Sequence, residues 1–273
     1  MTEPVTPPPQ PLVRAALASA RIPRALERTS RSALSALWLG VLSEDALGEL
    51  DEQYYGFETM YHTAEWNEGG LLPWERTLVD ERVAPGSRVI VLGCGGGREA
   101  LALLEDGFDA VGYDPHPALV AYAEELLTAH GHPGRAFVSP RDDFPPGAPP
   151  SDAVLVGWGA YTLIRGRATR LRVLAGARDV LPAGAPIILS FLQAPRFGRG
   201  LRMTVSVANA LRRARGGEPL ELGDTLAPNL VHVFTPEQVA GEIAAAGLEL
   251  VEYRRVGQAD MPVAYAAVVA RVP

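Results

Sequence analysis

The chain has 273 residues, an apolar fraction of 47% and a formal net charge of −7. This length fits one α/β domain with extensions, and the apolar fraction is sufficient for a sizeable core. The acidic balance and the scattered arginines disfavour a nucleic-acid surface, while the single cysteine, Cys94, excludes intramolecular disulfides and cysteine-rich zinc or iron–sulfur sites.

Membrane attachment is not expected either. No apolar run reaches about 18 residues, the length that a membrane-spanning helix needs. The first residues also lack the basic-then-apolar pattern of a secretory signal. We therefore predict a cytoplasmic protein with no membrane partner.

Residues 1–50 are predicted to form an arm and a helical extension. Residues 6–11 are rich in proline, so we expect an extended arm there. Apolar residues with three-and-four spacing predict helices over residues 12–50. Such helices can pack on the core or on a second copy of the chain, so one expectation is a homodimer formed through them.

Residues 51–82 are predicted to form a lid segment. Their first part is denser in aromatic side chains than any other stretch of the chain, and polar residues and glycines interrupt it. We expect an irregular segment that folds over the ligand end of the core. Tyr61 and Trp66 are its candidate substrate contacts, and His62 is a candidate general base.

Residues 83–192 are the predicted core, in which strands alternate with helices. This alternation predicts right-handed crossovers and a parallel sheet. The expected strands are 88–93, 109–114, 135–139, 152–157 and 185–192, and the expected helices lie near 97–106, 116–130 and 166–181.

A glycine cluster follows the first strand of this core. Gly93, Gly95 and Gly97 allow positive φ angles and let a ligand lie directly on the backbone. The helix that begins next adds unpaired N–H donors and a positive dipole end. The second strand ends at Asp114, where an acid can bind the hydroxyl pair of a ribose. The segment therefore predicts a site for a nucleoside-containing cofactor.

The spacing of the glycines distinguishes between cofactors. The dinucleotide fingerprint has a third glycine at the position of Arg98, where a bulky side chain fits poorly. A phosphate-binding loop of the Walker type needs a lysine, and the chain contains none. A nicotinamide-dependent oxidoreductase is thus the second choice among enzymes.

The pattern Gly93-x-Gly95-x-Gly97, followed by Asp114, resembles motifs I and II of the class I S-adenosylmethionine-dependent methyltransferases of the small-molecule type. The resemblance covers about residues 75–195. It implies a doubly wound, seven-stranded, mostly parallel sheet with an antiparallel last strand, and S-adenosylmethionine as the cofactor. Many members carry an acid two residues before the first glycine, where this chain has Val91.

The resemblance also implies contacts after the later strands. Pro115 follows the ribose-binding acid, and Asp143 with Phe144 is the expected adenine contact. Asp142 is the alternative to Asp143 as the adenine contact, and both acids can equally be solvated turn residues. After the fourth strand, Trp158 is expected against the cofactor and Tyr161 beside the acceptor, with a role in packing as the alternative for both.

Residues 193–235 break the alternating pattern and are predicted to form a helical cap insertion over the ligand end of the sheet. His232, near the end of this insertion, joins His62 and Tyr161 as a candidate catalytic residue. A base is needed only if the acceptor must lose a proton. For each histidine, a structural role is the alternative.

Residues 236–273 are predicted to complete the core. Thr235-Pro236-Glu237-Gln238 is a capping box that opens a helix to about Ala246. Two last strands, 248–256 and 263–272, are joined by the short link 257–262, which suits an antiparallel hairpin.

These features predict in-line methyl transfer from S-adenosylmethionine to a small, apolar or aromatic acceptor. The donor is already activated, so alignment and desolvation can supply much of the rate. No nucleic-acid partner and no metal are expected. A non-catalytic, cofactor-binding regulatory relative of the family is the alternative outside enzymes.

Overall fold

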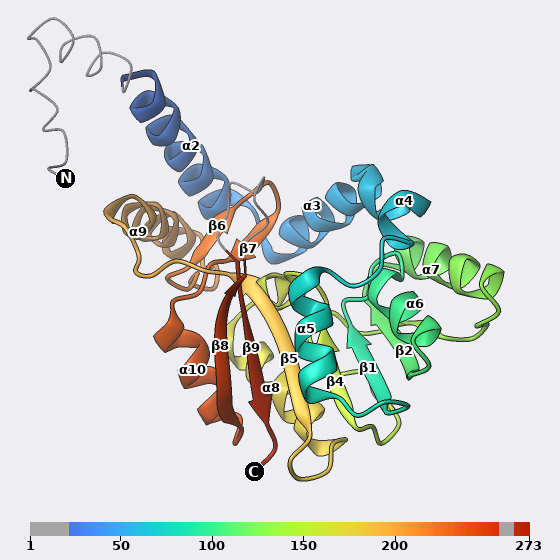
Figure 1. Cartoon of the computed structure of the whole chain (residues 1–273). Coiled ribbons are helices and arrows are strands. Elements are labelled where there is room, and N and C mark those ends of the chain that lie inside the picture. Colours follow the sequence, from blue (N-terminus) through green and yellow to red (C-terminus); the bar gives the residue numbers. More distant parts are fainter. Residues whose placement is uncertain (1–21, 257–264) are drawn as a thin grey trace, which may run out of the picture.

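The computed structural model describes residues 22–256 and 265–273, and its core is a seven-stranded sheet (Figure 1). The strand order is β3-β2-β1-β4-β5-β9-β8. Strands β1 to β5 pair in parallel, and β9 runs antiparallel to both β5 and β8. The predicted mostly parallel sheet with an antiparallel last strand is confirmed. The strands are β1 (Arg88–Leu92), β2 (Asp109–Asp114), β3 (Ala136–Val138), β4 (Ala153–Val156), β5 (Pro186–Leu192), β8 (Glu249–Val256) and β9 (Tyr265–Arg271).

Helices cover both faces of this sheet. Alternate residues of each buried strand face opposite sides, so Ile90 packs in one apolar cluster and its neighbour Val91 in the other. Both side chains are fully buried. The Ile90 face carries α8 (Arg167–Asp179) and α10 (Pro236–Ala245), and the Val91 face carries α5 (Pro73–Arg82), α6 (Arg98–Glu105) and α7 (Pro117–Ala129).

The predicted capping box opens α10. Thr235 Oγ1 accepts from the Gln238 backbone N–H at 3.3 Å, and the Gln238 side chain accepts from the Thr235 N–H at 3.0 Å. The predicted hairpin link 257–262 lies outside the described residues. The two strands beside it pair antiparallel, as expected.

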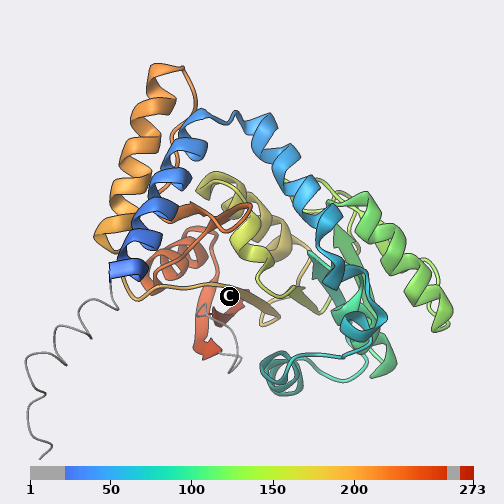
Figure 2. The same ribbon diagram turned by 90° about the horizontal axis from the view of Figure 1, so that it is seen from above.

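A separate layer lies above the carboxyl ends of the parallel strands. Helix α2 (Ile22–Val41) packs along α9 (Arg199–Ala214), and the hairpin of β6 (Asp224–Leu226) and β7 (Leu230–His232) lies beneath them. Helix α3 (Glu44–Phe57) then runs from this pair towards α7 (Figure 2). The expected proline-rich arm lies outside the described residues.

The predicted lid is more helical and shorter than expected. It contains the end of α3, the 3-10 turn η1 (Thr59–His62) and α4 (Ala64–Asn67). Helix α5 belongs to the core instead, because Leu78 and Val79 are buried against the sheet. The expected boundary at residue 50 falls inside α3. Because α3 is one continuous helix, the name lid segment is used below for residues 44–72, which include all of α3 and end before α5.

Among the described residues, no helix is long and apolar enough to cross a membrane. Within the same part of the chain, no group of three or more potential ligand side chains could hold a metal ion.

Candidate functional site

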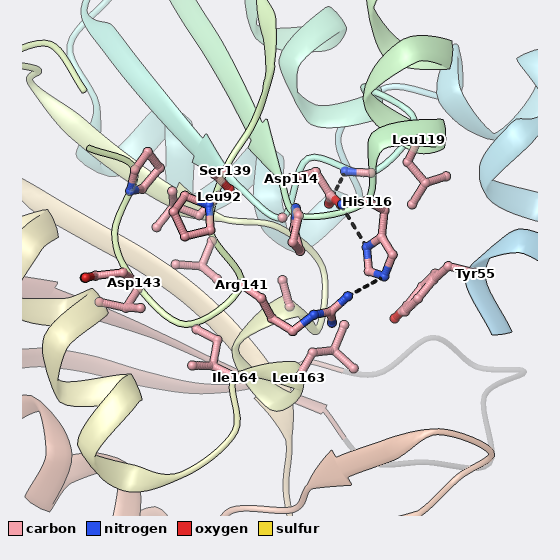
Figure 3. Close-up of a pocket in the computed structure, with 18 of the residues that line it drawn as sticks. Tyr55, Leu92, Asp114, His116, Leu119, Ser139, Arg141, Asp143, Leu163 and Ile164 are labelled. Carbon is pink, nitrogen blue, oxygen red and sulfur yellow. Dashed lines mark hydrogen bonds and ion pairs between the residues drawn. The ribbon is translucent and has the colours of Figure 1, made fainter. Parts of the chain in front are cut away.

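A cavity of about 120 Å³ lies at the carboxyl ends of the parallel strands (Figure 3). Ligands of doubly wound sheets bind at this edge. The floor is formed by the residues that follow β1, β2, β3 and β4, and the lid segment supplies the opposite wall. Lining residues include Tyr55, Tyr61, Gly93, Gly95, Asp114, Pro115, His116, Arg141, Asp143 and Trp158.

Gly95 is the residue of the glycine loop that is open to the cavity. Its φ is +51°, and an added Cβ would meet nothing nearer than a Tyr61 ring carbon at 4.0 Å. Gly93 also lines the cavity, but a Cβ there would lie 2.6 Å from that of Ala160. Gly97 caps α6 behind the loop, where an added Cβ would meet Ala123 at 3.2 Å, so it shapes the turn without lining the cavity.

The carboxylate of Asp114 joins the glycine loop to the next turn. Its Oδ2 accepts from the Gly95 N–H at 2.9 Å. Its Oδ1 accepts from the backbone N–H of His116 at 2.9 Å and contacts His116 Nδ1 at 3.0 Å. A carboxylate has about four lone-pair sites. One site on Oδ2 is therefore left for a ligand hydroxyl, and a second hydroxyl would have to compete with the His116 ring.

A cluster of opposite charges surrounds His116. Asp51 from α3 forms an ion pair with Arg141, which follows β3. Asp51 Oδ2 lies 3.4 Å from His116 Nε2, and Arg141 Nη2 lies 2.9 Å from the same nitrogen. The contact with the Asp51 carboxylate is favourable when the imidazole is charged. The contact with the Arg141 guanidinium is favourable when the imidazole is neutral. Tyr55 packs on the ring, with centroids 4.7 Å apart. The cluster thus ties the lid segment to the floor of the cavity.

The charge of His116 gives a pH prediction. Burial lowers its pKa, but hydrogen bonds to Asp114 and Asp51 outweigh burial and raise the pKa to about 9. The unfolded value is about 6.5. The stability that the charged His116 contributes to the folded state is therefore fully present below about pH 6.5 and is lost as the pH rises through about 9.

Urea unfolding of the wild type and of His116→Gln at pH 6.5 and pH 9.5 measures this effect. We expect the stability difference between the two proteins to shrink at the higher pH. An equal difference at both pH values would show that His116 is not held charged by its neighbours.

The adenine side of the cavity differs in part from expectation. Asp143 lines the cavity, and its Oδ1 accepts from the Phe144 N–H at 2.8 Å. Phe144 itself turns into the core, where it packs against Gly176 of α8. Phe144 does not line the cavity, so its expected contact with the cofactor has no support in the geometry. Pro145 and Val173 are apolar residues that line the same cavity, and Asp142 is exposed outside the lining.

Two smaller cavities adjoin the first, and all three share Tyr61 and Trp158. One, of about 100 Å³, lies between the lid segment and the β6–β7 hairpin. The other, of about 30 Å³, lies between the glycine loop and Trp66, whose ring is 5.4 Å from that of Trp158. Tyr61 and Trp158 therefore stand at a three-way junction. The 100 Å³ cavity is lined by Tyr54, Tyr55, Tyr61, Trp158, Gly159, Thr162, Leu163, Leu192, Ala227, Asn229, Val231 and Tyr265.

Neither candidate histidine lines these three cavities. His62 Nε2 contacts the backbone oxygen of Tyr55 at 3.3 Å, and its ring packs edge-on to Tyr122. His232 is buried, with Nδ1 2.7 Å from Asp224 and its ring against Phe234. Their expected role as general bases therefore has no support in the geometry.

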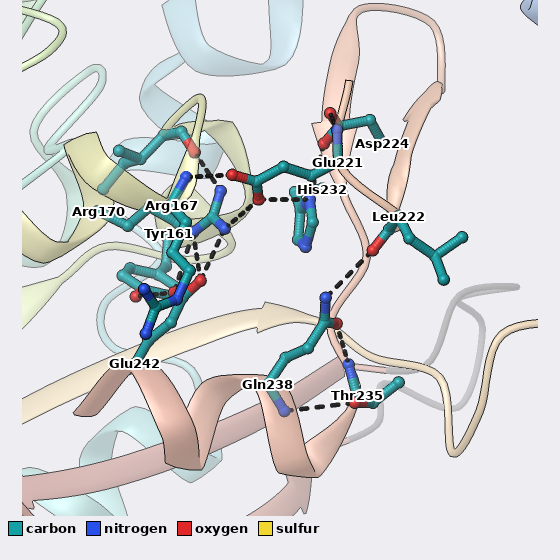
Figure 4. Close-up of polar contacts among 11 residues, drawn as sticks. Tyr161, Arg167, Arg170, Glu221, Leu222, Asp224, His232, Thr235, Gln238 and Glu242 are labelled. Carbon is teal, nitrogen blue, oxygen red and sulfur yellow. Dashed lines mark hydrogen bonds and ion pairs between the residues drawn. The ribbon is translucent and has the colours of Figure 1, made fainter. Parts of the chain in front are cut away.

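Tyr161 is also a core residue rather than a wall of the cavity (Figure 4). The 3-10 turn η2 (Ala160–Leu163) carries it inward, where its hydroxyl donates to Glu242 of α10 at 2.6 Å. Its ring stacks on Phe234 at 5.1 Å. Burial raises the pKa of the phenol well above its usual value. Tyr161 lines none of the three cavities, so its expected contact with the acceptor has no support in the geometry.

Several residues of the site were not predicted from the sequence. Asp51, Tyr55 and Arg141 line or support the main cavity, and Tyr265 and Asn229 line the cavity between the lid segment and the hairpin. Arg141 has a local signal, because it follows a parallel strand, and Tyr55 lies in the segment whose aromatic density predicts a lid. The others come from elements whose placement depends on tertiary packing.

The comparisons with known proteins establish the fold. No protein-family model matches the chain, and no curated protein matches it. Among solved structures, a SAM-dependent methyltransferase from Methanosarcina mazei has 16% identity and a TM-score of 0.58, over 74% of this chain and 98% of that one.

Two further structures are similar in extent. The CcbJ methyltransferase from Streptomyces caelestis has 18% identity and a TM-score of 0.58, over 81% of this chain and 98% of its own. The 1,6-didemethyltoxoflavin-N1-methyltransferase from Burkholderia thailandensis, solved with bound 1,6-didemethyltoxoflavin and S-adenosylhomocysteine, has 17% identity and a TM-score of 0.54. It covers 98% of this chain and 92% of its own. The fold that the resemblance implied is confirmed.

Proposed function

We propose that this protein is an S-adenosylmethionine-dependent methyltransferase that acts on a small, apolar or aromatic molecule. The observation that carries the proposal is the three-way junction at Tyr61 and Trp158. Methyl transfer needs three adjoining spaces: one for the nucleoside of the donor, one for the amino-acid end of the donor, and one for the acceptor. The fold, shared with proteins that perform this reaction, supports the same conclusion.

The nucleoside belongs in the cavity of about 120 Å³. There Gly95 lets the ligand approach the backbone, Asp114 accepts from the ribose, and Asp143 and Pro145 lie where the base would extend. When bound, the cofactor supplies an electrophilic methyl group. The residues of this chain supply position and exclusion of water.

The acceptor belongs in the cavity between the lid segment and the hairpin. Its walls combine aromatic rings with aliphatic side chains, which suits an apolar or aromatic molecule. Among the residues that the structure describes, no carboxylate, imidazole or thiol lines it, and burial raises the pKa of Tyr61, so that this phenol stays protonated. We propose an acceptor atom that attacks without a protein base, guided by closure of the lid segment.

The variant Asp114→Ala tests the cofactor site. It removes a carboxylate that would accept from a ribose hydroxyl, and a hydrogen bond to a charged group contributes roughly 1.5–3 kcal/mol. We expect affinity for S-adenosylhomocysteine to fall at least about tenfold in calorimetry. Glu125→Ala, an exposed acid on α7, is the control and should bind normally. Unchanged affinity in folded Asp114→Ala would contradict the ribose assignment.

A homodimer through the N-terminal helices stays a prediction. Leu34, Leu37 and Trp38 of α2 support it, because these large apolar side chains are exposed at helical spacing. The mass in solution, measured by sedimentation, tests it. A cytoplasmic location also stays a prediction.

A further inference from the structure

The cavity of about 30 Å³ beside the glycine loop has polar walls with unused bonding capacity. Asn67 Oδ1 and Arg98 Nε are both buried without a hydrogen-bond partner among the described residues, and both residues line this cavity. Asn67 is 1% exposed and Arg98 2%. Buried polar atoms rarely lack a partner, so such atoms in a cavity wall point to a missing ligand or water.

The orientation of the Asn67 amide is determined by its neighbours. Its Nδ2 donates to the backbone oxygens of Tyr61 and Thr63, each at 2.9 Å. Both amide hydrogens are thereby used, so Oδ1 is the amide atom left without a partner. The amide lies over Gly96 of the glycine loop, where an added Cβ would lie 2.6 Å from Oδ1 and 2.7 Å from Nδ2. The free atom of Asn67 is an acceptor, which a donor complements, whereas the free Nε of Arg98 is a donor.

The charges below Asn67 favour a cation. Arg98 is the one cation in a buried cluster with two acids: it donates to Glu75 at 2.7 and 2.9 Å and to Glu99 at 2.6 Å. Two carboxylates against one guanidinium leave the cluster with one formal negative charge in excess. Burial and the charge of Glu99 raise the pKa of Glu75 to about 7, so Glu99 is the acid that keeps its charge most readily. Glu99 uses only Oε1 for Arg98 and for the Trp158 N–H at 3.1 Å, and no described residue hydrogen-bonds to its Oε2.

We propose that Asn67 Oδ1 and Glu99 bind the α-ammonium group of the cofactor's amino-acid end in this cavity. The inference rests on the proposed function, which places the nucleoside in the adjoining cavity. The volume is sufficient for a group of about the size of a water molecule. Val91, two residues before Gly93, offers no acceptor side chain, whereas Asn67 of the lid segment and Glu99 of α6 both line the cavity.

The test compares two ligands that differ only in the ammonium group. They are S-adenosylhomocysteine and its analogue with hydrogen in place of the α-ammonium. Calorimetry measures both on the wild type and on Glu99→Gln, which keeps the shape and removes the charge. We expect the wild type to prefer S-adenosylhomocysteine at least about tenfold, and Glu99→Gln to lose most of this preference while its affinity for the analogue stays unchanged.

Two further variants complete the design. Asn67→Leu removes the acceptor and should reduce the same preference, without the loss of a charge. Glu105→Gln, at the exposed end of α6, is the matched control and should keep the full preference.

The outcomes separate this inference from the proposed function. If the wild type binds neither ligand, the proposed function fails, and the inference fails with it. If both ligands bind the wild type equally, the cofactor site stands and the ammonium assignment is wrong. The assignment is also wrong if Glu99→Gln and Asn67→Leu both keep the wild-type preference, in which case the cavity holds a structural water.

Discussion

Gly95→Val is expected to abolish binding of S-adenosylhomocysteine while the protein stays folded. Gly95 lines both the main cavity and the cavity of about 30 Å³, and a Cβ there would have open space up to the Tyr61 ring 4.0 Å away. The two methyl groups of valine would then occupy space that the nucleoside needs. The other cost is a positive φ for a β-branched residue, which is about 1–2 kcal/mol. Calorimetry measures the binding, and circular dichroism reports the fold.

Gly131→Val is the matched control for backbone strain. Gly131 also has a positive φ, +85°, and an added Cβ there meets nothing within 4 Å. It lies after α7, away from the cavity, so this variant should lose similar stability and bind the ligand normally. Normal ligand affinity in folded Gly95→Val would show that the cofactor does not lie on the glycine loop.

Glu242→Ala is expected to have the largest effect on stability. Arg170 is 1% exposed and donates to Glu242 through Nε and Nη2 at 2.7–3.1 Å. Removal of one partner of a buried ion pair leaves a charge that is poorly solvated, which costs about 3–5 kcal/mol. Glu221 also accepts from Arg170, at 2.6 Å, so we expect the lower end of this range. Urea unfolding measures the loss.

A second variant in the cluster of Tyr161, Arg170 and Glu242 tests the structural role of Tyr161. Tyr161→Phe removes its hydrogen bond to Glu242 and should lower stability with no change in affinity for S-adenosylhomocysteine. Glu237→Ala, an exposed acid on the same helix, is the control and should cost no more than about 1 kcal/mol. A loss of stability in Glu242→Ala no greater than that of the control would mean that Arg170 finds other partners.

The sequence predicts the floor of the site well, because its signals are local. Gly95 and Asp114 follow apolar runs that can only be buried parallel strands, and the carboxyl ends of such strands meet at one edge. The alternation of strands and helices is also a local signal, and it predicts that the strands of the sheet are parallel. The seven strands and the antiparallel last strand follow from the resemblance and the closing hairpin.

The walls of the site could not be predicted in the same way. Tyr161 and Phe144 follow parallel strands as the site residues do, yet both point into the core. The direction is decided by distant partners, Glu242 for Tyr161 and Gly176 for Phe144. His232 likewise faces Asp224 across the β6–β7 hairpin. Residue type and distance from a strand end do not contain this information.

In the lid segment, residues that were not predicted as site residues do reach the site. Its aromatic residues and glycines predict an irregular cover, and Tyr61 does reach the junction of the three cavities. Its polar residues are equally important, and nothing in the local sequence distinguishes them. Asp51 pairs with Arg141, and Asn67 turns an unpaired oxygen to the glycine loop. A contact between segments far apart in the chain makes each of them a site residue.

The central claim is that the cavity at the strand ends binds the nucleoside of S-adenosylmethionine. Calorimetric titration of the full chain with S-adenosylhomocysteine and, separately, with NAD tests it most directly. We predict saturable one-site binding of S-adenosylhomocysteine and no binding of NAD, because Arg98 occupies the place of the third dinucleotide glycine. Tight binding of NAD, with no binding of S-adenosylhomocysteine, would contradict the account.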